Sequence, residues 1–144
     1  MHEIKHIIDI ASPLESVYPL VSVPEGLAHW WSADVTADPA SGAADVGFFR
    51  RETVYRLMPE KMVPEERAYW RCETGKEWQG TTIKFDLLGA DGKTTVHFSH
   101  GGWKEETDYF IGCNTVWGRL LFQLKAVAEG KRPGPLFTRE GMAD

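Results

Sequence analysis

The sequence predicts an α+β domain in which a curved antiparallel sheet wraps around one long C-terminal helix. Between about residues 46 and 100, the chain shows successive short stretches with the alternation typical of strands. From about Thr107 the apolar residues follow a helical period instead. A chain of 144 residues fits one domain. We therefore expect a single domain over residues 1–144, with a core from about 3 to 137 and a short C-terminal tail.

Composition and charge limit the classes of partner. The formal net charge is −5, and basic residues are interleaved with acidic ones, as in "RRETVYR". Nucleic acid and anionic membranes reward a clustered basic face, so we expect neither nucleic-acid binding nor membrane insertion. The N-terminal "MHEIKHIIDIA" lacks the features of a signal peptide, which favours a cytoplasmic location. The two cysteines are far apart and are expected to be reduced and buried.

The first expected element is a strand over residues 4–10, "IKHIIDI". Its alternation places Ile4, His6, Ile8 and Ile10 on one face, which we expect to point inward.

Two short helices should follow. In "SPLE", Ser12 is expected to be the N-cap, Pro13 the first helical residue and Glu15 the third, which together form a capping box. Pro19 would clash inside a long helix, so the first helix should be short or kinked. Pro24 then opens a second helix, in which three large apolar residues share a face: Leu27, Trp30 and Trp31.

The following strands differ in how clearly they are marked. Residues 46–55 alternate without a clean polar face, so the inward set is either Phe48, Arg50 and Glu52, or Phe49 and Arg51. Residues 56–66 carry two prolines and are expected to contain strand ends around an irregular crossing. Residues 67–73 indicate a half-buried antiparallel strand whose inner residues are Ala68, Trp70 and Cys72.

The clearest hairpin joins "TTIKFDLL" to "TTVHFSH" through a turn at residues 89–93. Ile83, Phe85 and Leu87 should face inward from its first strand, and Val96 and Phe98 from its second.

A long helix begins near Thr107 and ends at Gly130. Acidic residues lie at the positive end of its dipole. Its apolar stripe consists of Tyr109, Cys113, Val116, Trp117, Leu120, Leu121, Leu124 and Val127. One helix cannot fill the concave side of a strongly curved sheet, so we expect a cavity between the two.

Several stretches carry a resemblance to a known family: "ASPLESVYPLVSVPEGLAHWWSADV", "EWQGTTIKFDL", "HFSHGGW" and "GRLLFQLKAVAEGKRPGPLF". With the order of elements, they resemble the helix-grip fold of the START, polyketide cyclase and birch-pollen-allergen superfamily (SRPBCC), and within it the homologues of the heat-shock-protein ATPase activator. The resemblance covers about residues 3–137. It implies an apolar or amphipathic small molecule bound between sheet and helix, cyclisation of polyketides, or contact with a chaperone.

Our leading hypothesis is a small-molecule binding protein that uses this cavity. One of Trp30 and Trp31 should be core and the other should face the contents. The expected ligand-binding residues are Trp31, Phe48, Arg50, Trp70, Phe85, Val96, Phe98, His100, Trp103, Cys113 and Trp117. Of these, Trp31, His100 and Trp103 are placed at the rim.

Two alternatives remain open. A cyclase- or hydrolase-like enzyme would use His100 or Arg50 for proton transfer or oxyanion stabilisation, although no catalytic motif stands out. A protein-interaction module of the co-chaperone type would need an exposed apolar patch. His97 and His100 fall on opposite faces of a strand, so we expect no metal site, and we expect no cofactor. A homodimer is a further expectation for a small domain.

Overall fold

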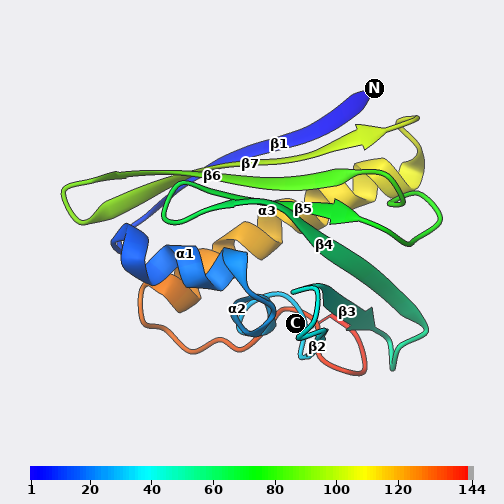
Figure 1. The fold of residues 1–144 in the computed structure, drawn as a ribbon, viewed down its shortest axis with the longest axis horizontal. Helices are drawn as coiled ribbons and strands as arrows, with labels where there is room; N and C mark the ends of the chain where they lie inside the picture. The colour runs from blue at the N-terminus through cyan, green and yellow to red at the C-terminus, as the bar shows by residue number, and fades with distance from the viewer. Residues whose placement is uncertain (143–144) are drawn as a thin grey trace.

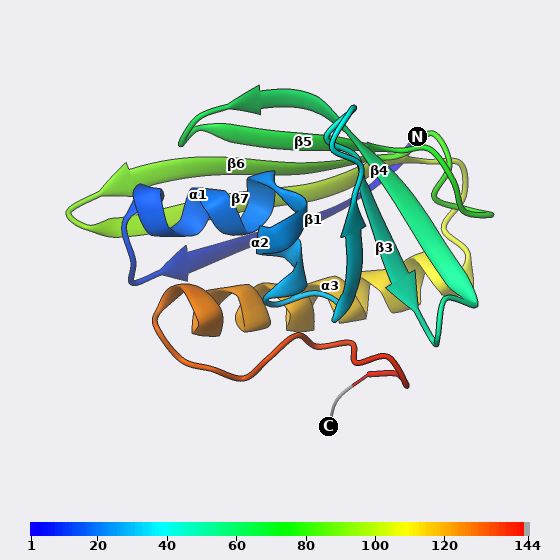
Figure 2. The ribbon, with the colours of Figure 1, turned by 60° about the horizontal axis from the view of Figure 1, so that its bottom comes forward.

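In the computed structural model, which describes residues 1–142, seven strands form one antiparallel sheet and the helices lie on one side of it (Figure 1, Figure 2). The elements are β1 (His2–Ile10), α1 (Leu14–Ser22), α2 (Pro24–Ala28), β2 (Asp34–Ala37), β3 (Ala44–Phe48), β4 (Thr53–Val63), β5 (Arg67–Cys72), β6 (Thr82–Ala90), β7 (Lys93–Trp103) and α3 (Asp108–Ala128). This confirms the expected α+β fold, with two short helices after the first strand and one long helix near the C-terminus.

The strand order across the sheet is β1-β7-β6-β5-β4-β3-β2. The hairpin of β6 and β7 pairs Phe85 with Phe98, and the inward residues expected on both strands are buried. The inward residues expected on β1 and β5 are also buried, apart from His6, which is half-buried. Alternation was a sufficient guide here because one face of each strand packs on the helices while the other meets solvent.

Helix α3 crosses the concave side of the sheet (Figure 2). Thr107 caps its N-terminus, since its hydroxyl accepts a hydrogen bond from the Phe110 amide at 3.2 Å. Gly130, at a φ of +88°, follows its C-terminal end, as expected. The buried residues are Phe110, Trp117, Leu120, Leu121 and Leu124. Phe110 takes the buried place that the sequence assigned to Tyr109, because its ring packs edge-on against Trp103.

The expected capping box at the start of α1 is wrong. Pro13 is the N-cap residue, and no side chain caps the helix. Ser12 is buried instead, and its carbonyl accepts a hydrogen bond from the Thr94 hydroxyl at 2.8 Å. The chain is therefore tied to β7 one residue before the cap. The expected short length is confirmed, because α1 contains Pro19 and ends at Ser22.

Residues 46–55 do not form one strand as expected. They form the end of β3, a turn over 49–52, and the start of β4. The backbone has positive φ at Phe49, Arg50 and Arg51, although none of these residues is a glycine or an asparagine. The turn therefore contains no residue type from which the sequence could have predicted it. The turn is stabilised by contacts with residues distant in sequence, since the Arg50 amide donates to the Arg139 carbonyl at 2.8 Å and Arg51 pairs with Asp34.

Residues 56–66 are also more regular than expected. Strand β4 continues through Pro59 to Val63, and its pairing with β5 shifts register between Pro59 and Lys61. A bulge tolerates a residue that cannot donate to the ladder, which explains how the proline is accommodated. The second proline, Pro64, lies in the turn that follows.

The tryptophan pair lies directly after α2, which ends at Ala28, and not on a face of that helix. Both indoles are buried and stack at 5.9 Å between ring centroids. The Trp30 Nε1 donates to the Leu20 carbonyl at 2.8 Å, and its ring meets Phe85 edge-on, so Trp30 belongs to the core. Trp31 points the other way, toward Trp117 on α3, with 5.0 Å between ring centroids.

The close contact of α1 and α2 gives a first prediction. A Cβ atom on Gly26 would lie 1.9 Å from the Pro19 carbonyl oxygen, which is backbone and cannot move aside cheaply. We expect Gly26→Ala to lower the free energy of unfolding by about 3 kcal/mol, measured by urea denaturation followed by tryptophan fluorescence. The control is Gly112→Ala on α3, where a Cβ meets no atom within 4 Å; it should raise stability by up to about 1 kcal/mol. Equal unfolding midpoints for the two variants would contradict this packing.

Candidate functional site

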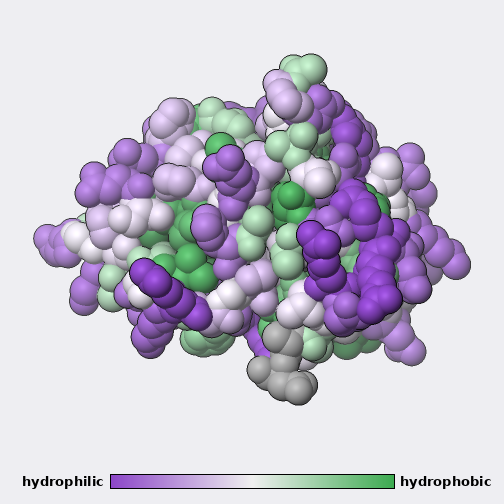
Figure 3. Space-filling view, turned by 90° about the horizontal axis from the view of Figure 1, so that it is seen from below, coloured by the Kyte–Doolittle hydropathy of each residue, from purple (hydrophilic) through white to green (hydrophobic). Residues whose placement is uncertain are grey.

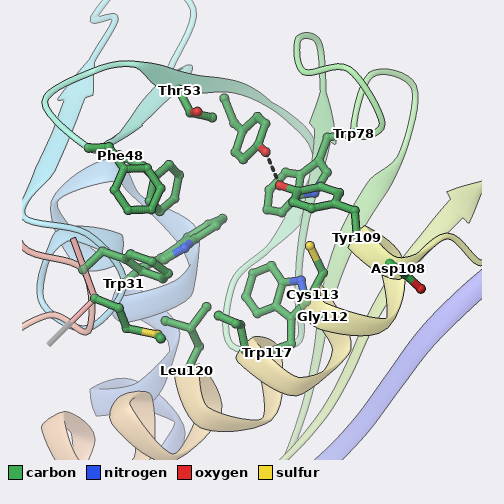
Figure 4. A pocket seen from close by; sticks show the side chains of 15 residues that line it. Trp31, Phe48, Thr53, Trp78, Asp108, Tyr109, Gly112, Cys113, Trp117 and Leu120 are labelled. Carbon is green, nitrogen blue, oxygen red and sulfur yellow. Dashed lines mark hydrogen bonds between the residues drawn. The ribbon is translucent and has the colours of Figure 1, made fainter. Parts of the chain in front are cut away.

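A pocket of about 570 Å³ lies between α3, the β3–β4 hairpin and the C-terminal segment, residues 129–142 (Figure 4). Its size falls in the range of small-molecule sites. It is lined by Trp31, Phe48, Phe49, Thr53, Tyr55, Trp78, Asp108, Tyr109, Gly112, Cys113, Val116, Trp117, Leu120, Phe137 and Met142. Most of these side chains are aromatic or aliphatic, so the surface that a ligand would meet is predominantly apolar.

The aromatic walls support one another. Tyr55 stacks on Trp78 with 4.0 Å between ring centroids, and Trp78 lies nearly parallel to Trp117 at 6.2 Å. Trp117 in turn meets Trp31. Because each ring is fixed by a neighbour, the walls are formed before any ligand enters.

A buried chain of hydrogen bonds fixes these indoles from behind. The Trp117 Nε1 donates to His100 Nδ1 at 3.1 Å. His100 Nε2 must then carry the ring proton, and it donates to the Thr81 hydroxyl at 2.8 Å, which itself donates to the Trp78 carbonyl at 2.6 Å. His100 is fully buried, and this burial lowers its pKa to about 3, so the ring is neutral.

Three titratable side chains, Tyr55, Tyr109 and Cys113, lie at one end of the pocket, whereas Thr53 lies near Phe48. The hydroxyls of Tyr55 on β4 and Tyr109 on α3 share a hydrogen bond, drawn as the dashed line in Figure 4. The Cys113 thiol lies one helical turn along α3 from Tyr109. Burial raises the pKa of Tyr55, of Tyr109 and of the Cys113 thiol, so all three groups are neutral near pH 7.

The C-terminal segment supplies a wall of its own. The Phe137 amide donates to the Trp31 carbonyl at 2.9 Å, and the Ala33 amide donates to the Phe137 carbonyl at 2.9 Å. These bonds place the Phe137 ring 5.0 Å from Phe48 between centroids. The tail is therefore part of the site, along with Met142.

The structure brings four of the expected ligand-binding residues to the pocket: Trp31, Phe48, Cys113 and Trp117. Five others are buried outside the pocket lining, namely Trp70, Phe85, Val96, Phe98 and Trp103. The Trp70 Nε1 donates to the Val21 carbonyl at 2.8 Å, and Phe85 packs on Trp30, so α1, α2 and the segment after them already cover these strands. A side chain can therefore face inward from the sheet without lining the pocket. Trp103 was expected at the rim but is buried near the start of α3, and its Nε1 donates to the His100 carbonyl at 3.1 Å.

Two polar expectations are also corrected. His100 does not reach the rim, because both of its ring nitrogens are engaged inside the core. Arg50 does not point inward, because it lies in the turn after β3 and its exposed guanidinium pairs with Glu140 at 2.6 Å. Cys72 is buried as expected, but Cys113 is half-buried because it faces the pocket, and both thiols are free.

Sequence reasoning missed the pocket roles of Tyr55, Tyr109 and Phe137. Tyr109 belonged to the expected helical stripe, so its place on α3 was visible, but its partner on β4 was not. Phe137 follows a proline- and glycine-rich stretch, and nothing in that stretch predicts that it returns to Trp31.

Among residues 1–142, no group of three or more His, Cys, Asp or Glu side chains is arranged to hold a metal ion. Within the same range, none of the helices combines the length and apolar character that crossing a bilayer requires.

A curved antiparallel sheet that grips a long C-terminal helix defines the helix-grip fold, and known proteins share it. The family model for Activator of Hsp90 ATPase homolog 1-like protein matches residues 11–129. The Aha1 dimer from Colwellia psychrerythraea is 28% identical, with a TM-score of 0.75 over 90% of this chain and 98% of that one. Protein CV1439 from Chromobacterium violaceum is 20% identical, with a TM-score of 0.71 over 90% of this chain and 98% of its own.

A third structure, DynU16 from the dynemicin biosynthetic locus, is 15% identical, with a TM-score of 0.69 over 92% of this chain and 49% of that one. No curated protein matches the chain. The family match spans most of the sequence, so this protein belongs to the Activator of Hsp90 ATPase homolog 1-like family, a branch of the SRPBCC superfamily.

The buried histidine yields a prediction about pH. Its pKa is about 3 in the folded protein and about 6.5 in an unfolded chain, so unfolding takes up a proton between these values. The stability that depends on neutral His100 is complete above about pH 6.5 and declines by about 1.4 kcal/mol per unit as the pH falls toward 3. We would measure unfolding free energies of the wild type and of His100→Gln from pH 7 to 4.

The wild type should be more stable than the variant at pH 7, and this difference should shrink as the pH falls. His97→Gln, at an exposed position of β7, controls for loss of a histidine as such. A difference that stays constant over the pH range would show that His100 is not held neutral.

Proposed function

We propose that this protein binds an apolar or amphipathic small molecule in the cavity between the sheet and α3. The observation that supports this most strongly is the pocket itself, whose walls are aromatic, mutually braced and open to a ligand. Trp31, Phe48, Cys113 and Trp117 are its proposed contacts, together with Tyr55 and Tyr109.

The size of the pocket argues against a packing imperfection. Protein interiors are close-packed, and voids larger than a few waters are rare. A space of about 570 Å³ lined by indole and phenyl rings exposes apolar surface that a ligand would cover. The fold agrees with this function, since SRPBCC proteins of this type bind hydrophobic ligands or act as polyketide cyclases.

An enzyme of the cyclase type is the second candidate, and one observation favours it. Tyr55, Tyr109 and Cys113 are titratable groups that meet at one end of the pocket, and a neutral tyrosine can donate a proton to a reacting oxygen. The likeness to a protein from a biosynthetic locus is consistent with such chemistry. His100 and Arg50, the residues first expected to transfer a proton, lie outside the pocket lining.

A chaperone contact has less support. Such a role needs a contiguous exposed apolar surface. Seen from the side where α1, α2 and the C-terminal segment lie, hydrophobic residues form patches separated by polar ones (Figure 3). The dimeric Colwellia relative supports a proposed homodimer, and a cytoplasmic location remains our proposal.

The binding proposal predicts that filling the pocket abolishes binding. Val116 is a half-buried pocket residue on α3, and its neighbour Thr115 is exposed and outside the lining. We expect Val116→Trp to weaken binding of the neutral dye Nile red at least about tenfold, because the indole occupies the ligand's space. Thr115→Trp is the matched control, and its dissociation constant should stay within about twofold of the wild type. Dye fluorescence measures both.

If Val116→Trp binds the dye as the wild type does while remaining folded by circular dichroism, the dye site is elsewhere and the proposal fails. No dye binding by the wild type would count against it equally.

A further inference from the structure

We propose that the pocket selects uncharged ligands that carry a hydrogen-bond acceptor, and that the acceptor is bound by the hydroxyl pair of Tyr55 and Tyr109. This inference rests on the proposed binding function and names the class of ligand that it serves.

The hydroxyl pair has one proton to spare. Two phenols carry two O–H protons, and the hydrogen bond between them uses one. The Tyr109 hydroxyl also interacts with the Cys113 thiol, but sulfur is a weak acceptor. A carbonyl, ether or hydroxyl oxygen of a ligand would accept the second proton more strongly than the thiol does.

A second donor lies beside this pair. Trp78 is almost fully buried, and its Nε1 has no hydrogen-bond partner among the described residues. The Cys113 thiol interacts with the Trp78 side chain, but sulfur is a weak acceptor. A buried donor without a good acceptor is costly, so a ligand oxygen that displaced the thiol would recover this loss.

The lining offers almost nothing to a charged ligand. No arginine, lysine or histidine is among the described residues that line the pocket, so a carboxylate would lose its hydration without gaining a cation. Both tyrosines are held neutral and can offer a carboxylate no opposite charge. Among the described residues that line the pocket, Asp108 at the N-terminal end of α3 is the one carboxylate, and it would repel an anion further. Because Asp108 is exposed, water screens its attraction for a cation.

The two ends of the pocket also differ in polarity. Figure 4 shows Tyr109, Cys113 and Trp78 at one end and Leu120 and Trp31 toward the other. Phe137 and Met142 belong to the apolar walls contributed by the C-terminal segment. A ligand would therefore place its acceptor oxygen between β4 and α3, and its hydrocarbon or aromatic part toward Leu120 and the tail.

The test uses four naphthalene probes on the intact protein: 2-isopropenylnaphthalene, 2-acetylnaphthalene, 2-naphthoate and 2-naphthylmethylammonium. The first keeps the shape of the ketone, because a CH₂ group replaces its oxygen. Dissociation constants would come from titrations followed by protein-observed NMR at pH 7. We expect 2-acetylnaphthalene to bind about three- to tenfold more tightly than 2-isopropenylnaphthalene, which is the worth of one neutral hydrogen bond. Both charged probes should bind at least about 30-fold more weakly than the ketone.

A variant pair assigns the preference to the tyrosines. In the double variant Tyr55→Phe with Tyr109→Phe, the ketone should lose its advantage over 2-isopropenylnaphthalene, while that hydrocarbon itself still binds. Tyr69→Phe is the control, since that hydroxyl bonds to Asp86 outside the pocket lining and its loss should change neither constant more than about twofold. The single variant Tyr55→Phe should keep most of the ketone preference, because the Tyr109 hydroxyl is then free to donate.

The outcomes separate the two proposals. If none of the probes binds, both the binding function and this inference fail. If 2-isopropenylnaphthalene binds but the ketone gains nothing, or the gain survives in the double variant, the site is real and the assignment to the tyrosine pair is wrong. Tightest binding of the carboxylate or of the ammonium probe would overturn the preference for uncharged ligands.

Discussion

The distance between α3 and the sheet is the constraint on which the site depends. On the side of β1 the two come close, since a Cβ atom on Gly118 would lie 3.6 Å from the His6 ring. Toward β4, large aromatic side chains hold helix and sheet apart, and the hydrogen bond from Trp117 to His100 fixes the first of them. The concave space therefore opens toward the β3–β4 hairpin, and the pocket lies where the side chains cease to fill it.

This arrangement divides the aromatic residues by role. Trp30, Trp70 and Trp103 have their indole N–H groups satisfied by backbone carbonyls inside the core, so they contribute to folding. The indole N–H of Trp117 donates to His100, which leaves the rest of the Trp117 ring available to line the pocket. Strong acceptors for all of their protons are lacking for the hydroxyl pair of Tyr55 and Tyr109 and for the indole N–H of Trp78. Donors left open in an otherwise apolar pocket are the means by which such a site would orient its contents.

The sequence predicted the parts of this fold that follow a single period. The alternation of β6 and β7 and the stripe of α3 were sufficient, because each element buries one face against one neighbour. The turn between β3 and β4 was not predictable, since Phe49, Arg50 and Arg51 carry no turn signal and are held by Arg139 and Asp34, far away in sequence. That error also placed Arg50 wrongly. For the site, alternation identified the residues that face inward from the sheet. It could not show which of these residues are covered by α1, α2 and Trp30, so Trp70 and Phe85 were wrongly expected to bind the ligand.

The most direct test of the central claim is native mass spectrometry of the freshly purified protein beside a denatured control. Our account predicts a reproducible extra mass that corresponds to an uncharged organic molecule and disappears on denaturation. It also predicts that the extra mass is absent when the pocket is filled by Val116→Trp. An unliganded mass for the wild type, or an extra mass retained by that variant, would contradict the account.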